Sequence, residues 1–537
     1  MGGLRDYLVL YAHNSRCHSP CQGTDQGYLM STAPSTFWAD EIAAQAIAQH
    51  SQNIVCTGIT PSGQIHIGNM REVLSGDAVY RSILAQGGKA RLIYLGDTYD
   101  ALRHVYPFLD EKTYAPQVGK PLSDIPCPCG KHESYAAHFL EPFLAAIREL
   151  GLDVEVKLAH EMYNTGEYTD VIFTALEKRD EIARILHEVT GKEIESDWSP
   201  VNPKCEACGR ITKARVTAWN RESHSVDYTC ECGHTGTADA ARGGAKLTWR
   251  VDWPARWKIL GVTVEPFGKD HASRGGSYDT GIAITKDIYG YQAPVPIVYE
   301  WISLKGKGDM SSSKGNVISI ADMVEVVPPD VLRYMIFRTQ PKKALTFDPG
   351  LPMLTLIDEL DDPESKTRDQ QAAELSMVSG MGSVGIPFKH LVSIVQIAGT
   401  DDDEAMKIIE RGGYAIHDRA AVLRRMAYAR KWLANYAPEE LKFSTQSRLP
   451  DEVSALPPAV KNALGWLAEH LDASMSGDTI HGLFYEAGNA TGTDAGEIFK
   501  GFYLSIIGKQ RGPRAGWFIV TLGVDFIRSR LLEAAKA

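Results

Sequence analysis

Two short segments of this chain carry residue types that handle phosphate groups. The first is His66-Ile67-Gly68-Asn69, which stands where a turn runs into a helix-forming sequence. The amino end of a helix presents unbonded N–H groups and the positive end of its dipole, and both favour phosphate. Gly68 leaves room for a nucleotide, and His66 can donate to charge that develops on a phosphate. The alternative is a plain turn with a partly buried histidine, and this segment alone leaves both open.

The second segment is a loop of serine and glycine with one lysine, Met310-Ser311-Ser312-Ser313-Lys314-Gly315-Asn316. A lysine on such a loop can reach the pyrophosphate end of a nucleoside triphosphate and neutralise charge during displacement. Asp309 directly precedes the segment, so no lysine stands there, and Lys305 and Lys307 are possible substitutes. A solvated loop is the alternative, and by itself the segment is weak support for nucleotide binding.

Four cysteines form two close pairs, Cys205 with Cys208 and Cys230 with Cys232, and a glycine follows each pair. In a large chain with nine cysteines, such pairs indicate metal ligands before disulfides. Tetrahedral zinc prefers four ligands of this kind. The alternatives are disulfides or free thiols. The Cys-x-Cys half is tighter than usual, so His234 could replace Cys230.

A second cluster is predicted at Cys127, Cys129, His132 and His138. These are four donors of the types that zinc accepts. The alternative is two surface histidines and two inert thiols.

The elements that must position these segments follow from the hydrophobic pattern. A helix is expected over residues 37–48, then a buried strand at 53–57, a turn at 60–63, a helix ending at a glycine pair, and a strand at 90–95. Strand, helix, strand is a unit of a parallel sheet. Later strands are predicted at 154–158, 262–265 and 295–301, and after about residue 347 only helices, such as 420–434 and 458–471.

Composition sets outer limits. Hydrophobic residues make up 44% and charged residues 23% of the 537 residues, which excludes a wholly disordered or collagen-like chain. No apolar run is long enough to span a membrane, and no secretory signal is recognised, so a cytoplasmic protein is expected. Residues 1–29 are expected to be a disordered extension. The net charge of −11 does not exclude a nucleic-acid partner, because binding depends on local patches.

Together, the two phosphate-handling segments resemble the signature motifs of the class I aminoacyl-tRNA synthetases. The surrounding sequence is similar to the class I lysyl-tRNA synthetase family, from about residue 37 to the carboxyl terminus, and glutamyl-tRNA synthetase is the nearest confusable family. The stretches that carry the similarity are Phe37-Trp38-Ala39-Asp40, Thr57-Gly58-Ile59-Thr60-Pro61-Ser62-Gly63, Arg71-Glu72-Val73-Leu74, Trp249-Arg250-Val251-Asp252-Trp253-Pro254-Ala255-Arg256-Trp257, Phe267-Gly268-Lys269-Asp270-His271, Gly275-Gly276-Ser277-Tyr278-Asp279-Thr280-Gly281 and Arg511-Gly512-Pro513-Arg514.

The resemblance implies an α/β fold: a Rossmann-like parallel-sheet catalytic domain with zinc-bearing insertions, followed by an all-α helix-cage domain that binds the anticodon. The first half of the catalytic domain would cover residues 30–104, and its second half, with a stem-contact segment, residues 246–348. The insertion with both zinc sites would cover 105–245, and the anticodon-binding domain 349–537. The family's zinc site near residue 130 uses an Asp, a Cys and two His. Here Cys127 replaces the Asp, Lys131 replaces the Cys, and Cys129 is an extra thiol.

The resemblance also implies a reaction. Lysine and ATP would form lysyl-adenylate, and the lysyl group would pass to the 2′-OH of the terminal adenosine of tRNA-Lys. Mg²⁺ would accompany ATP, and Zn²⁺ would occupy the cysteine clusters. His66, Gly68, Asn69 and Lys314 would be catalytic. The implied contacts to ATP are His66, Asn69, Asp270, Met310, Ser311, Ser312, Ser313 and Lys314.

The substrate lysine needs a carboxylate partner, because an unpaired buried ammonium is costly. Any single aspartate could instead be a cap or a surface charge, and Asp270 could equally bind the ATP ribose. The pocket candidates, near predicted strand ends or glycine turns, are Gly58, Thr60, Asp97, Asp100, Trp249, His271, Tyr278 and Asp279, with Asp252, Trp253 and Asp270 as further possibilities.

The carboxyl-terminal region offers positive charge interleaved with aromatic residues, which suits phosphates and unstacked bases. A solvated helix face over core aromatics explains the pattern equally well. Arg511 and Arg514 pose the same choice. The residues concerned are Arg419, Arg424, Arg425, Arg430, Lys431, Tyr414, Tyr428, Trp432 and Tyr436.

Three functions compete with lysine–tRNA ligation. A class I synthetase for glutamate would show an arginine in the pocket. A non-catalytic RNA-binding relative would not need His66, Gly68 and Lys314 intact. A nucleotidyltransferase that does not use tRNA would leave the helical region after residue 347 without a task.

Overall fold

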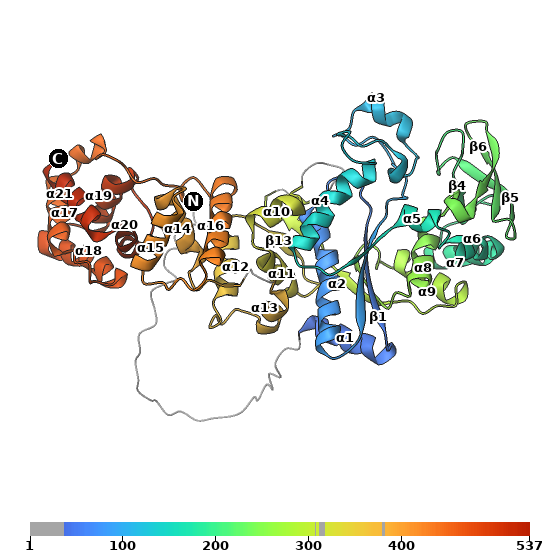
Figure 1. Cartoon of the computed structure of the whole chain (residues 1–537), viewed down its shortest axis with the longest axis horizontal. Helices are drawn as coiled ribbons and strands as arrows, with labels where there is room; N and C mark the ends of the chain where they lie inside the picture. Colours follow the sequence, from blue (N-terminus) through green and yellow to red (C-terminus); the bar gives the residue numbers. More distant parts are fainter. Residues whose placement is uncertain (1–36, 307, 311–316, 379–381) are drawn as a thin grey trace. The chain divides into compact units, whose positions relative to one another are not determined.

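A computed structural model describes residues 37–306, 308–310, 317–378 and 382–537. Its centre is a five-stranded, wholly parallel sheet with the strand order β10-β9-β1-β2-β3 (Figure 1). The strands are β1 (Asn53–Ile59), β2 (Ala90–Gly96), β3 (Glu155–Leu158), β9 (Val264–Gly268) and β10 (Val295–Tyr299). The predicted Rossmann-like sheet is thus confirmed.

The first strand–helix–strand unit lies where the hydrophobic pattern predicts it. β1 pairs with β2 from Asn53 opposite Ala90 to Ile59 opposite Gly96. Between them runs α2 (Ile67–Ala85), which follows α1 (Trp38–Gln49). Most residues of α2 are buried, as expected of a helix that packs on a sheet.

Both faces of the sheet are covered, because successive residues of a strand point to opposite sides. Val55, Leu92 and Tyr94 join one hydrophobic core, with α1 and α2. Their neighbours Cys56 and Ile93 join a second core. The second core is built with α5 (Ala159–Asn164), α6 (Thr169–Glu177), α7 (Arg179–Thr190), α8 (Trp249–Leu260) and α9 (Ser277–Asp287).

The strand order reverses between β1 and β9, since β1 continues to β2 on one side and β9 to β10 on the other. In open parallel sheets the crevice at such a reversal, outside the carboxyl ends of the strands, is where ligands bind. Here the residues that follow β1 and β9 include Thr60, Asp270 and His271.

The long span between β2 and β9 forms two additions to the sheet. The first carries α3 (Glu111–Tyr114), precedes α4 (Tyr135–Glu149) and has its own small core. The second combines a two-stranded sheet, β4 (Val201–Pro203) with β8 (Ala245–Leu247), and an antiparallel ribbon of β5 (Ala214–Asn220), β6 (Ser225–Cys230) and β7 (Thr235–Asp239).

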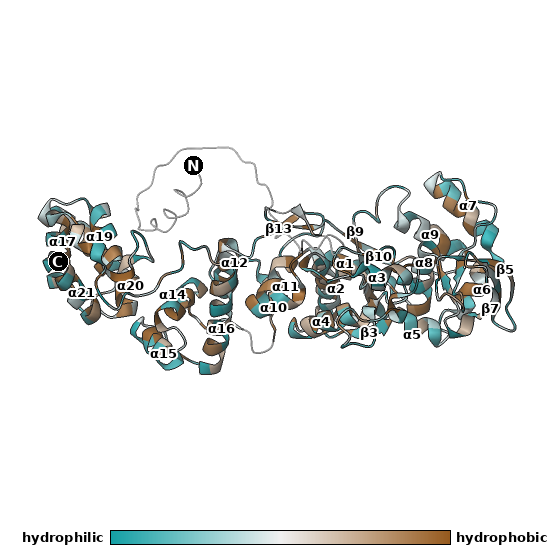
Figure 2. Cartoon of the chain, turned by 90° about the horizontal axis from the view of Figure 1, so that it is seen from above, coloured by the Kyte–Doolittle hydropathy of each residue, from teal (hydrophilic) through white to brown (hydrophobic). Residues whose placement is uncertain are grey.

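After β10 come a small sheet of β11 (Ile302–Leu304), β12 (Gly308–Asp309) and β13 (Leu345–Phe347), with two described α-helices between β12 and β13, and after β13 only helices among the described residues. Figure 2 shows hydrophobic and hydrophilic residues mixed along these helices, as in amphipathic helices. None of the described helices is both long and apolar enough to cross a bilayer. The helices are α10 (Ile320–Val326), α11 (Pro329–Phe337), α12 (Leu351–Asp361), α13 (Gln370–Ser376), α14 (Phe388–Ala398), α15 (Asp402–Arg411), α16 (Arg419–Asn435), α17 (Pro458–His470), α18 (Gly477–Thr491), α19 (Ala495–Ile507), α20 (Ala515–Leu522) and α21 (Val524–Lys536).

This helical region contains two hydrophobic cores. Buried residues of α12 to α16 belong to the same core as one face of the sheet, whereas α17 to α21 enclose a core of their own. The division of the chain at residue 349 stays a prediction, and residues 1–29 lie outside the described part of the chain.

Candidate functional site

A cleft of about 340 Å³ opens at the strand-order reversal. It brings together residues from four of the stretches that carry the family resemblance. Two of these stretches lie before residue 75 and two lie after residue 248. Its lining is Gly58, Ile59, Thr60, Ser62, Ile65, Asn69, Glu72, Asp97, Trp249, Trp253, Arg256, Glu265, Pro266, Phe267, Gly268, Asp270, His271, Tyr299 and Trp301.

The side chain of His66 caps α2. Its Nδ1 accepts from the backbone N–H of Gly68 at 3.1 Å, and the Asn69 side chain accepts from the backbone N–H of His66 at 3.2 Å. Burial lowers the pKa of His66 to about 4, so the ring is neutral at physiological pH. With Nδ1 accepting, the ring proton lies on Nε2, and that nitrogen is the donor.

The amino end of α2 differs from the sequence argument in one respect. The N–H groups of Ile67, Gly68 and Asn69 donate to Ile318 O, His66 Nδ1 and His66 O. They are not unbonded, so side chains are the better placed donors to a phosphate. Gly68 has a second reason to be glycine: a Cβ there would lie 2.8 Å from the His66 ring.

Described residues on both sides of 311–316 lie beside the first signature segment. The backbone of His66 pairs with Ser319, and Ile67 donates to Ile318 at 3.0 Å. Met310 lies close to Gly68, since a Cβ on this glycine would be 3.6 Å from the Met310 methyl group. Lys305 pairs with Asp348 at 2.6 Å. Ser311, Ser312, Ser313 and Lys314 lie outside the described residues, as does Lys307.

Glu72 lines the cleft and connects three elements through hydrogen bonds. It accepts from the backbone of Gly58 and from the Tyr299 hydroxyl, both at 2.8 Å. Burial raises its pKa to about 8, despite these two donors. Glu72 comes from α2, Gly58 from β1 and Tyr299 from β10, so this carboxyl joins three elements at the mouth of the sheet.

A second buried acid, Glu265 on β9, also lines the cleft. It accepts from the indole N–H of Trp253 at 2.9 Å and from that of Trp257. Burial raises its pKa to about 7. The sequence reasoning did not single out Glu265 or Glu72. The available signal was a charged residue inside an otherwise apolar strand, and one on the apolar face of a helix.

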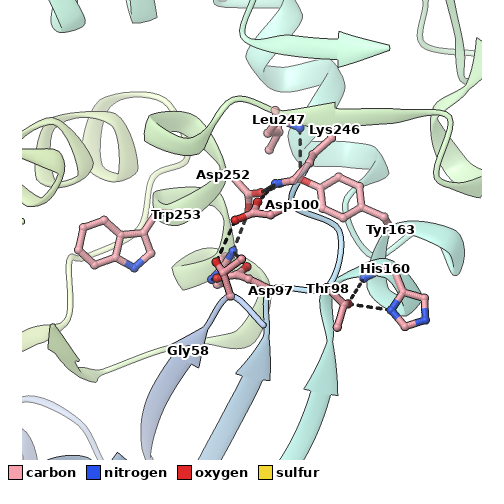
Figure 3. A network of polar contacts seen from close by, with 12 residues as sticks. Gly58, Asp97, Thr98, Asp100, His160, Tyr163, Lys246, Leu247, Asp252 and Trp253 are labelled. Carbon is pink, nitrogen blue, oxygen red and sulfur yellow. Dashed lines mark hydrogen bonds and ion pairs between the residues drawn. The ribbon is translucent and has the colours of Figure 1, made fainter. Parts of the chain in front are cut away.

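Three of the candidate aspartates, Asp97, Asp100 and Asp252, are already paired with cations of the protein (Figure 3). Asp97 forms two bonds with Arg256, at 2.6 and 3.2 Å. Asp100 lies 3.3 Å from Lys246, which contacts Asp252 at 2.5 Å. Burial would raise the pKa of Asp252, but Lys246 and Arg256 lower it below its usual value.

The remaining pocket candidates separate into two groups. Thr60 lines the cleft and donates to Asp100 at 3.0 Å. Trp249 stacks on Trp253 with ring centres 5.5 Å apart, and His271 lies 5.4 Å from Trp253, which makes an aromatic wall. Asp270 also lines the cleft, whereas Asp100, Tyr278 and Asp279 are not part of its lining. The Tyr278 hydroxyl donates to Pro294 at 2.8 Å, and Asp279 accepts from Gly275 at 2.9 Å.

Four thiols converge at the root of the antiparallel ribbon, those of Cys205, Cys208, Cys230 and Cys232. Two of their sulfur–sulfur distances are 3.7 and 3.8 Å. Zinc–thiolate bonds of about 2.3 Å in a tetrahedron require about 3.8 Å between sulfurs. The donors therefore fit zinc. His234 instead pairs with Glu206 at 2.8 Å, so it does not replace Cys230.

The second cluster also converges, with its four donor atoms within 4.8 Å of one another. Cys127 and Cys129 lie 3.3 Å from the Nδ1 atoms of His132 and of His138 respectively, and the two Nδ1 atoms are 3.3 Å apart. His132 Nε2 lies 3.7 Å from Glu141, as the outer partner of a metal-bound histidine would. This donor set also fits zinc.

The basic and aromatic segment on α16 is largely internal. Arg425 is buried between Asp330 and Asp361 at 3.2 and 3.0 Å. The indole of Trp432 is buried and donates to Pro349 at 2.7 Å. The exposed Arg419 and Lys431 pair with Asp403 and Glu325, and the half-buried Arg430 pairs with Asp402. Most of these residues thus stabilise packing.

Comparison with known proteins identifies the family of this chain. The family described as "tRNA synthetases class I (K)" matches residues 36–381. A lysine–tRNA ligase from Methanosarcina barkeri is 49% identical, covering 94% of this chain and 98% of that protein. One from Archaeoglobus fulgidus is 47% identical, covering 93% and 99%. A solved glutamate tRNA ligase from Elizabethkingia meningosepticum covers 90% of this chain and 99% of its own, with a TM-score of 0.43 and 14% identity, too weak a likeness to bear on function. The chain therefore belongs to the class I lysyl-tRNA synthetase family.

Proposed function

We propose that this protein is a lysine–tRNA ligase, which joins lysine to ATP as lysyl-adenylate and passes the lysyl group to tRNA-Lys. The observation that carries the proposal is the cleft at the strand-order reversal. It combines Asn69, from the capping motif of α2, with two buried glutamates that have no cation of the protein beside them in a hydrogen bond or ion pair among the described residues.

The reaction needs positioning and charge stabilisation more than a covalent nucleophile. The lysine carboxylate attacks the α-phosphate of ATP, and pyrophosphate leaves. The neutral His66 ring donates from Nε2 to the developing charge. Asn69 and Lys314 add donors to the phosphates, and Asp270 holds the nucleotide at the other side of the cleft. Mg²⁺ binds mainly through the substrate phosphates and neutralises their charge.

The amino-acid end of the cleft favours a cation. Glu265 and Glu72 present buried carboxyls, while Asp97 and Asp100 are already paired with protein cations. We therefore assign the substrate ammonium to Glu265, beside the wall of Trp249, Trp253 and His271 that covers the aliphatic stem. Gly58 and Thr60 lie at the end of β1 as further contacts. An arginine does line the cleft, Arg256, but Asp97 binds it on both oxygens, which disfavours a glutamate substrate.

The two cysteine clusters are proposed to hold one zinc ion each, with structural roles. Each cluster offers four protein ligands, which would fill the tetrahedral coordination of zinc and leave no open position for catalysis. Reduced thiols at both sites suit a cytoplasmic location. The tRNA is proposed to contact the helical carboxyl-terminal region through its anticodon.

The test is aminoacylation of total tRNA with ATP and each labelled amino acid in turn, with tRNA always present. Charging with lysine alone is expected. Charging with glutamate would overturn the pocket assignment. No charging by a folded, zinc-loaded sample would favour an RNA-binding relative without catalysis.

A further inference from the structure

Lys246 is a buried ammonium that the proposed reaction does not use. Its side chain is 6% exposed. Its Nζ lies 2.5 Å from Asp252 and 3.3 Å from Asp100, and 5.5 Å from the centre of the Tyr163 ring. These two ion pairs hold the buried ammonium in place. Removing Lys246 would leave buried carboxylates without their cation, which is costly.

Both partners of Lys246 lead into the cleft (Figure 3). Asp100 accepts from the hydroxyl of Thr60, a lining residue. Asp252 lies 3.4 Å from Arg256. Arg256 in turn binds Asp97, and Arg256 and Asp97 both line the cleft. Three carboxylates thus share two cations. Without Lys246, Asp100 would lose its ion pair, and Asp97 and Asp252 would share Arg256 alone.

Lys246 belongs to the zinc-bearing addition, not to the sheet. It lies on β8, which pairs with β4 from Val201 to Pro203. The next residue along the chain, Lys204, donates to Gly244 at 2.8 Å, and Cys205 follows. The Tyr163 hydroxyl fixes β8 from the other side, because it donates to Asp252 at 3.1 Å and accepts from Leu247 at 3.2 Å.

We propose that Lys246 is a positioning residue for the amino acid: it holds Thr60 through Asp100, and the Asp97–Arg256 pair through Asp252, in the arrangement that binds lysine. This inference rests on the proposed function. It makes the pocket depend on where the zinc-bearing addition sits, because that addition supplies the cation. Lys246 itself touches neither substrate.

Three variants test the proposal in the full-length, zinc-loaded protein. Lys246→Met removes the ammonium and keeps the length of the side chain, and Lys246→Arg restores a cation. Lys213→Met is the matched control, because Lys213 belongs to the same addition but pairs with Glu231 at the surface. We expect Lys246→Met to raise the KM for lysine by about tenfold or more, as misplaced contact groups do. The KM for ATP should change by less than about threefold, Lys246→Arg should recover part of the loss, and Lys213→Met should match the wild type.

The coupling to the pocket is measured by a double-mutant cycle with Thr60→Val. If Lys246 acts through Thr60, the fold-increase in the KM for lysine of the double variant should be smaller than the product of the fold-increases of the two single variants. An unchanged KM for lysine in folded Lys246→Met, or fully independent effects in the cycle, would overturn the proposal. If Lys246→Met does not fold, Asp100→Ala decides in its place, since a normal lysine KM there also refutes the link. Wild-type protein that charges no lysine would instead refute the proposed function itself.

Discussion

His66 does two jobs with one ring. Its Nδ1 stabilises the start of α2, and in the proposed reaction its Nε2 is the donor to the phosphate. The fixed tautomer follows from the cap, because a ring nitrogen that accepts a hydrogen bond cannot also carry the proton. Burial keeps the ring neutral well below physiological pH, with a pKa of about 4.

The two roles of His66 can be separated. Asparagine is a good helix N-cap, so His66→Asn should unfold at nearly the wild-type temperature, whereas His66→Ala should lose about 1 kcal/mol of stability. Both variants lose the Nε2 donor, and adenylate formation should fall by about 100-fold or more. Thermal unfolding and single-turnover adenylate formation measure the two effects. Near-normal turnover in His66→Asn would show that the ring does not contact the reacting phosphate.

Glu265 should make lysine binding depend on pH. Its pKa of about 7 means that it is mostly protonated at pH 6 and mostly ionised at pH 8. An ammonium binds the ionised form, so the KM for lysine should fall by about tenfold as pH rises from 6 to 8. Glu265→Gln should have a higher KM for lysine that no longer falls over this range. Asp279→Asn, which changes a carboxyl outside the cleft lining, is the control. A pH-dependent KM that persists in Glu265→Gln would place the ammonium elsewhere.

The residues of the site differ in how far the sequence could predict them. The candidate metal donors stand in short motifs whose spacing encodes their geometry, so the sequence predicted that their donor atoms converge, and His66 likewise stands in a short motif at the start of a helix. Glu265 and Glu72 were missed because their role depends on which strands meet at the reversal, and no local pattern carries that information. The pairing of Asp97 with Arg256 joins positions 159 residues apart, so the sequence could not show which carboxyls were already neutralised.

At the scale of elements, the second addition, which runs from β4 to β8 and contains the four-cysteine cluster, begins and ends in very short strands. β4 and β8 are only three residues each, too short to be stable alone. Cys205 and Cys208 precede β5, Cys230 ends β6, and Cys232 follows it. A zinc ion bound by these four thiols is therefore expected to stabilise this addition. The core beneath them is small, with Cys205, Tyr228, Cys230 and Ala238.

Zinc removal at this site should affect more than local stability. Cys205→Ser should lose about one zinc ion per chain in elemental analysis, and its KM for lysine should rise through the displacement of β8. Cys129→Ser should also lose about one zinc ion, but its cluster lies in the other addition, so its effect on the lysine KM should be smaller. Unchanged metal content in Cys205→Ser would refute the first zinc site. Equal effects of both variants on lysine would argue against transmission through β8.

Regular elements were predictable because one residue pattern specifies each of them. β1, α2 and β2 lie within about two residues of the predicted bounds, and α16 and α17 likewise. The sheet order was not predictable in the same way. β1 and β9 are adjacent although two insertions separate them. The edge strands β5 and β7 show no clear alternation of buried and exposed residues, because they are mostly exposed.

At the scale of the whole molecule, charge must be distributed unevenly for an acidic chain to bind RNA. The net charge is −11, and much of the positive charge on α16 is used in ion pairs with neighbouring aspartates and glutamates. The density of arginine in a segment is therefore a poor guide to its RNA contacts. Exposed cations beyond these pairs are better candidates.

Arg511 is such a candidate. It is exposed and lies between α19 and α20, next to Arg514, which pairs with Asp478 at 3.0 Å. Each cation that binds a phosphate releases counterions, so its loss weakens binding more at low salt and flattens the dependence on salt by about one unit of slope. Arg511→Glu should accordingly raise the KM for tRNA several-fold, about fivefold at low salt, and leave the KM for lysine unchanged.

The matched control is Lys89→Glu, which makes the same change of charge. Lys89 is exposed and directly precedes β2, so it lies at the amino edge of the sheet, away from the cleft at the carboxyl edge. If both variants raise the KM for tRNA equally, the effect is one of net charge and Arg511 makes no specific contact. If only Arg511→Glu does so, and the salt slope falls with it, the carboxyl-terminal helices contact the tRNA backbone there, and an acidic molecule binds its polyanionic substrate through a small number of unpaired cations.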